Sequence, residues 1–159
     1  MPCNKGGYTM CQVSHVVNTI VHQAQIEKIA LSPMKLQKVL YFVYKQYLKA
    51  YKKALFSERF EAWVYGPVIS EVYYAYKNRK DKNINEYMID ANGSLKMIDP
   101  NESPDFGRAF FNAWDRYKRF SGIELSGFTH SPNSAWTIAV SENRAFLSDI
   151  DIEAEDEYA

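Results

Sequence analysis

Three Ser-Pro pairs, at residues 32–33, 103–104 and 131–132, constrain the possible folds of this sequence most. Serine is a favoured helix N-cap, and proline fits the first helical position because its missing N–H would have no partner there. Each pair precedes apolar residues at helical spacing. The longest such stripe follows the first pair and consists of Leu36, Val39, Leu40, Val43 and Tyr47. We therefore predict a mainly α fold, a compact multi-helix single domain.

Other helix ends can be placed from capping patterns. Ser14 is expected to cap a first helix, and the central helix is expected to end near Tyr51. Ser121 and Glu124 match the Ser-x-x-Glu capping box, in which each side chain binds the backbone N–H of the other residue, so another helix starts there. A final short helix is expected over residues 148–157.

A small β element is expected between the second and third helices. Residues 59–65 alternate side chains and are rich in aromatics, which is typical of a short strand. The Gly66-Pro67 pair is expected to end this strand and to start the next helix in one step. Glu61 shares a strand face with aromatic residues, and an unpaired buried charge is costly, so we expect it to be held by basic or backbone donors. A general base at this position is the alternative interpretation.

A second hairpin is expected further along the chain. The Asn92-Gly93 pair is a strong signal for a tight β-turn. It would join two short strands over residues 86–90 and 94–99.

Charge is unevenly distributed, although the formal net charge is zero. All 19 lysines and arginines precede Asp149, and the last eleven residues carry six acids, which leaves the body with a net charge of +6. We divide the chain into a flexible segment over 1–13, a domain over 14–147 and an acidic tail over 148–159. The tail is interpreted as a solvated, frayed terminus; shielding of the basic body or binding of a partner are the alternatives.

The central helix carries a basic flank. No acidic residue occurs between Lys28 and Glu58. Spacings of 7, 4 and 3 residues place four lysines on one side of the helix: Lys38, Lys45, Lys49 and Lys52. This flank is either a solvated face or a docking face for an acidic partner surface. Nucleic acid is not expected as a partner, because the whole chain is neutral and has no recognised binding motif.

Sequence motifs for catalysis are missing. There is no Gly-x-Ser-x-Gly and no phosphate-binding loop. Cys11 and His15 are four residues apart and could share a helix face, but no second ligand pair follows, so we predict no metal and no cofactor. An enzyme that uses Glu61 or His130 is the weakest alternative.

The cysteines and the apolar runs bear on location. Cys3 and Cys11 form no disulfide framework, which suits a reducing cytoplasm. No signal peptide opens the chain, and no apolar run approaches 18 residues. We expect a cytoplasmic protein that does not enter a membrane.

Four segments resemble the Panacea domain of SocA-like antitoxins and occur in the same order as in that family. They are Lys-Leu-Gln-Lys-Val-Leu-Tyr-Phe at 35–42, Glu-Ala-Trp-Val-Tyr-Gly-Pro-Val at 61–68, Ser-Gly-Ile-Glu-Leu-Ser at 121–126 with Thr129-His130, and Trp136. The resemblance covers roughly residues 14–140. Each motif is modest alone, and the four in order are specific.

The resemblance implies a non-enzymatic antitoxin. Panacea-domain proteins bind and neutralise protein toxins of unrelated folds, often encoded by a neighbouring gene and frequently in prophages. One branch acts as an adaptor that delivers its toxin to the ClpXP protease, which is the alternative mechanism. The candidate partner-binding residues are Lys38, Tyr41, Lys45, Trp63 and Tyr65. The residues expected to shape the motifs are Glu61, Gly66, Pro67, Ser121, Glu124, Thr129 and His130.

Overall fold

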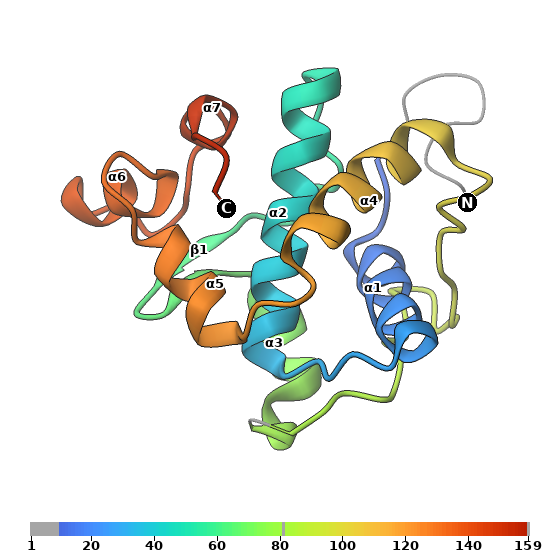
Figure 1. Cartoon of the computed structure of the whole chain (residues 1–159). Helices are drawn as coiled ribbons and strands as arrows, with labels where there is room; N and C mark the ends of the chain where they lie inside the picture. Colours follow the sequence, from blue (N-terminus) through green and yellow to red (C-terminus); the bar gives the residue numbers. More distant parts are fainter. Residues whose placement is uncertain (1–9, 81, 159) are drawn as a thin grey trace.

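Helix α2 lies at the centre of the molecule, and the other elements pack around it (Figure 1). The structure, a computed structural model, describes residues 10–80 and 82–158. The helices are α1 (Val13–Glu27), α2 (Pro33–Tyr51), α3 (Ser70–Tyr76), α4 (Pro104–Tyr117), α5 (Gly122–Thr129), α6 (Ala135–Ser141) and α7 (Asp149–Ala154), with a 3₁₀ turn η1 (Lys77–Arg79). The strands are β1 (Glu61–Trp63) and β2 (Gly66–Val68). The predicted architecture, mainly helical with a small β element between the second and third helices, is confirmed.

The predicted limits of α2 are confirmed. The Ser32 hydroxyl accepts a hydrogen bond from the Lys35 amide at 3.1 Å, and Pro33 occupies the first turn. The helix contacts α1, α3, α4, α5, α7 and β2. Because neighbours surround it, α2 is buried on nearly all sides, and the burial includes Lys38 and Lys45.

The β element is a hairpin, which corrects the predicted strand-to-helix junction. Strands β1 and β2 pair antiparallel with Trp63 opposite Gly66, so the chain reverses within two residues. Gly66 and Pro67 lie in β2, and α3 begins only at Ser70. The prediction failed because Gly66 has a φ of +113°, a conformation that glycine alone adopts readily and that no right-handed helix contains.

The hairpin predicted around Asn92-Gly93 is wrong as a pair of strands. A turn does form there, but residues 82–99 contain no strand. The Asn18 side chain binds the backbone on both sides of the turn, accepting from the Met88 amide and donating to the Lys96 carbonyl, each at 2.7 Å. A side chain of α1 therefore binds backbone groups that a strand partner would have bound.

Four further helix starts were predicted; those at Ser103-Pro104, at Ser121 and near residue 148 are correct, and the one at Ser131-Pro132 is wrong. Ser121 and Glu124 form both hydrogen bonds of the capping box at the start of α5. Helix α6 is capped by Ser134 and not by Ser131. Asn133 has a φ of +64°, which a right-handed helix does not contain. Helix α6 therefore cannot extend back to Ser131-Pro132.

The N-terminal prediction is tested only in part. Residues 1–9 of the predicted flexible segment lie outside the described residues. Helix α1 begins at Val13, so Ser14 lies within the helix and does not cap it. Cys11 is disulfide-bonded.

The acidic C-terminal segment, residues 149–158, packs on α2, so its interpretation as a frayed terminus is wrong. Three ion pairs join the segment to the helix: Lys45–Glu155 at 2.9 Å, Lys49–Glu157 at 3.9 Å and Lys52–Glu153 at 2.6 Å. Glu155 is only 2% exposed. The segment thus covers the C-terminal half of the basic flank, as the shielding alternative predicts.

Candidate partner-binding site

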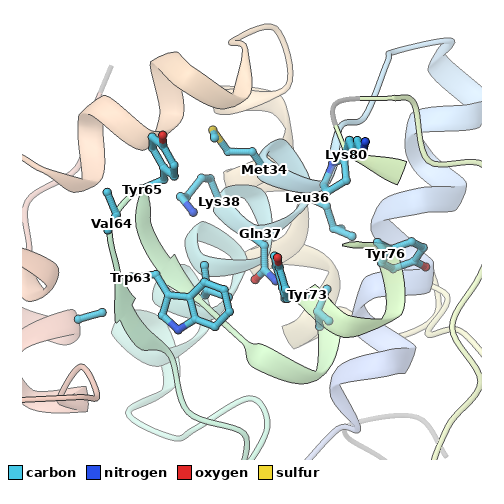
Figure 2. A pocket seen from close by; sticks show the side chains of 14 residues that line it. Met34, Leu36, Gln37, Lys38, Trp63, Val64, Tyr65, Tyr73, Tyr76 and Lys80 are labelled. Carbon is cyan, nitrogen blue, oxygen red and sulfur yellow. The ribbon is translucent and has the colours of Figure 1, made fainter. Parts of the chain in front are cut away.

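A groove of about 590 Å³ opens between the N-terminal half of α2, the β1–β2 hairpin and α3 (Figure 2). Its lining residues are Pro33, Met34, Leu36, Gln37, Lys38, Ala62, Trp63, Val64, Tyr65, Val68, Val72, Tyr73, Tyr76 and Lys80. The lining is mostly apolar and includes no acidic residue. These features suit a surface that binds a partner by apolar contact.

Exposed apolar side chains stand at the mouth of the groove. Val64 and Tyr65, the two residues of the hairpin turn, are 78% and 64% exposed. The Trp63 and Tyr73 rings lie edge to face with centroids 4.8 Å apart, and Figure 2 shows them next to each other. Aromatic residues beside a groove are common anchors of protein–protein contacts, because they bury a large area with few rotatable bonds.

The backbone of the hairpin turn is held from the opposite side by α5 and α6. Three consecutive carbonyl oxygens are bound by side chains: Trp63 O by Trp136 Nε1 at 2.7 Å, Val64 O by His130 Nε2 at 3.0 Å, and Tyr65 O by Ser126 Oγ at 2.5 Å. The carbonyl groups of the turn are therefore bound within the molecule, while Val64 and Tyr65 expose their side chains. Much of the sequence resemblance thus maps onto one structural unit that fixes the turn.

Gly66 allows this close approach of the hairpin to α5. A Cβ atom at this position would lie 2.5 Å from Thr129 Oγ1 and 2.9 Å from Lys38 Cε. Thr129 is fully buried, and its hydroxyl donates to the Ser126 carbonyl at 2.6 Å. Only glycine combines the positive φ with the space that these neighbours need.

Lys38 places its amino group in the wall of the groove. Its side chain reaches from α2 toward the hairpin (Figure 2), and the residue is 1% exposed. The ammonium group donates to the Pro67 carbonyl at 3.1 Å. Burial lowers the pKa of Lys38 to about 7, because the charged form loses its hydration.

The candidate contact residues fall into two groups. Lys38, Trp63 and Tyr65 line the groove, with Lys38 only 1% exposed in its wall. Tyr41 and Lys45 are completely buried under the C-terminal segment and both bind Glu155. In this structure they are not accessible to a partner.

Of the residues considered for catalysis, His130 has side-chain partners and Glu61 has backbone pairings. His130 binds the hairpin through Nε2, its Nδ1 lies 2.6 Å from the Ser126 carbonyl, and its ring packs on Trp136 at 3.9 Å. Glu61 is half-buried, pairs with Val68 in the hairpin and forms a bridge with Phe146. Within residues 10–80 and 82–158, no three His, Cys, Asp or Glu side chains gather as metal ligands would.

Sequence reasoning missed two important residues. Tyr73 lies on a short helix without a clear apolar period, and only the adjacent Tyr73-Tyr74 pair could have suggested an aromatic surface. Glu155 lies in an acidic run typical of a solvated tail, so no local pattern indicates its burial.

Comparison with known proteins gives three findings. The family model for the SocA-like antitoxins, Panacea domain, matches residues 36–137. Antitoxin SocA of Caulobacter vibrioides (strain NA1000 / CB15N) is 26% identical over 126 residues, which cover 77% of this chain and 67% of that protein. No solved structure matches the chain.

In the described part of the chain, no helix is both long and apolar enough to span a membrane.

Proposed function

The chain belongs to the family of SocA-like antitoxins with a Panacea domain, and we propose that it neutralises a protein toxin by binding it directly through the α2–hairpin–α3 groove. The toxin is the product of a neighbouring gene, and the two proteins meet in the cytoplasm. The antitoxin works by contact and not by catalysis.

One observation carries this proposal: the hairpin turn is fixed internally and yet exposes its apolar side chains. Val64 and Tyr65 lie beside the groove, and the turn that carries them is bound by Ser126, His130 and Trp136. A surface held in one conformation loses little entropy when a partner binds. Exposed apolar residues on such a surface favour binding over solvent contact.

The expected contact residues are Lys38, Trp63 and Tyr65, together with Val64 and Tyr73, which the structure adds. Tyr41 and Lys45 contribute indirectly, because they hold the C-terminal segment against α2. The motif residues Gly66, Thr129 and His130 support the turn from behind.

Growth rescue by co-expression tests the proposal. The neighbouring gene product is expressed with the wild-type chain, with Val64→Asp, or with Ile150→Asp. Ile150 is a matched control, since it is 80% exposed but lies on α7, away from the groove. We expect rescue and a stable complex with the wild type and with Ile150→Asp, and loss of both with Val64→Asp. Equal rescue by all three variants would refute the proposed surface.

The lifetime of the toxin separates direct neutralisation from delivery to the ClpXP protease. Direct neutralisation leaves the half-life of the toxin unchanged when the antitoxin is depleted. An adaptor would shorten the half-life only while it is present, and only in cells with the protease. A pulse-chase measurement in cells with and without ClpXP therefore decides between the two mechanisms.

A further inference from the structure

Lys38 is a buried lysine with no buried carboxylate beside it. Its ammonium has three donor hydrogens, and the structure provides the Pro67 carbonyl for one of them. No carboxylate among residues 10–80 and 82–158 forms an ion pair with it. An ammonium that is buried without a counterion is costly, so a carboxylate brought by a partner would offset part of that cost.

Lys45 shows how the same helix satisfies a buried lysine. It lies seven residues after Lys38, which is two helical turns, and is completely buried. Its ammonium lies 2.9 Å from Glu155 Oε2 and also donates to the Asp156 carbonyl. Glu155 has an extended backbone just after α7. An extended acidic segment of this chain thus occupies the position over Lys45, whereas Lys38, which is 1% exposed, lines the wall of a groove that no described segment fills.

The lining of the groove specifies what kind of segment would fit. Two lysines, Lys38 and Lys80, line it, and the rest of the lining is neutral and largely apolar. Trp63 and Tyr73 are in edge-to-face contact and together form an aromatic wall of the groove near Lys38. A purely apolar segment would leave the ammonium unpaired, and a highly charged one would lose hydration against the aromatic walls.

We propose, resting on the function proposed above, that the groove takes an extended segment of the toxin in which an Asp or Glu stands between apolar residues, and that this carboxylate pairs with Lys38. The apolar neighbours pack on Trp63, Tyr65 and Tyr73. The carboxylate provides the selectivity of the groove, because only a segment with an acid at the right position satisfies the ammonium.

Paired peptides test the inference with the full chain. An array presents seven-residue peptides with a central Glu, flanked on both sides by combinations of Leu, Phe, Tyr and Trp, and each has a twin with a central Gln. The best pairs are then measured by fluorescence anisotropy. We expect the Glu peptides to bind about tenfold tighter than their twins, or more. Lys38→Met should bring this ratio close to one, and Lys82→Met, a change of an exposed lysine outside the groove, should leave it intact.

Several results would overturn the inference: equal binding of both series, a preference for Glu that survives Lys38→Met, or no binding by either series. If 3-phenylpropionate alone bound as tightly as the Glu peptides, the groove would be a site for small acids and the peptide proposal would be wrong. Failure here is distinguishable from failure of the proposed function. If Val64→Asp abolishes toxin neutralisation but Glu and Gln peptides bind equally, the surface is right and only its acidic selectivity is wrong.

Discussion

Lys38 and Lys45 lie two turns apart on α2 and are both buried, and Lys45 alone of the two forms an ion pair among the described residues, with Glu155. The C-terminal segment that provides Glu155 covers one half of the basic flank. The other half borders a groove with exposed aromatic side chains. The helix therefore has an internally satisfied half and a half that we assign to the toxin.

Replacing Glu155 should destabilise the fold strongly. Glu155→Gln removes the charge that pairs with Lys45 and weakens the hydrogen bond from Tyr41, so an uncompensated charge is left in the core. We expect the free energy of unfolding in urea to fall by about 3 kcal/mol. Glu157→Gln is the matched control, because its pair with Lys49 is partly exposed and 3.9 Å long; its effect should stay below about 1 kcal/mol. Equal losses of unfolding free energy in the two variants would show that the buried Lys45–Glu155 pair is not a major contributor to stability.

Gly66→Ala should distort the hairpin. The new methyl group would lie 2.5 Å from Thr129 Oγ1, on a backbone with a φ of +113°. We expect a loss of about 2 kcal/mol in unfolding free energy and weaker toxin binding. Gly127→Ala is the control, since no atom lies within 4 Å of the added Cβ and the position is helical. It should be neutral or slightly stabilising. A stable, fully active Gly66→Ala protein would contradict the close packing.

Lys38→Met should stabilise the protein in a pH-dependent way. Burial lowers the pKa of Lys38 from 10.5 to about 7 in the folded state, so folding opposes protonation. Above pH 10.5 the lysine is neutral in both the folded and the unfolded state, so its burial does not lower the free energy of unfolding through charge. As pH falls from 10.5 to 7, the wild-type protein loses unfolding free energy by about 1.4 kcal/mol per pH unit, and below pH 7 this loss is constant. The stability advantage of the variant should follow this curve in urea titrations between pH 6 and 10. An advantage that is independent of pH would contradict the burial of the charged group.

Trp136→Phe should loosen the hairpin without unfolding the core. The change removes the indole N–H that binds the Trp63 carbonyl at 2.7 Å and keeps an aromatic ring. We expect a loss of about 1 kcal/mol in stability and faster hydrogen exchange at residues 62–68. Toxin affinity should fall as the turn becomes mobile. Unchanged exchange in the hairpin would show that this bond does not fix the turn.

Local patterns in the sequence predicted much of the scaffold. The cap at Ser32, the capping box at Ser121 and the apolar stripe of α2 each depend on residues close in sequence, and all three are confirmed. Errors arose where distant contacts decide the structure. The segment around Asn92-Gly93 forms a turn whose flanking backbone binds Asn18 of α1 and does not extend into paired strands.

The groove was only partly predictable for the same reason. Lys38, Trp63 and Tyr65 stood out because they lie in motifs that resemble the family. The burial of Tyr41 and Lys45 depends on Glu155, which is 110 or more residues away and lies in a run of acids. Charge counting identified the basic flank and the acidic segment. Only the fold shows that the acidic segment packs on the C-terminal half of the basic flank.

Hydrogen exchange of the antitoxin alone and in complex with its toxin tests the central claim most directly. Toxin binding in the groove predicts new protection in peptides over residues 62–76 and in the first half of α2, with little change over residues 149–158. Protection confined to the C-terminal segment and the second half of α2, with the hairpin unchanged, would contradict the proposed surface.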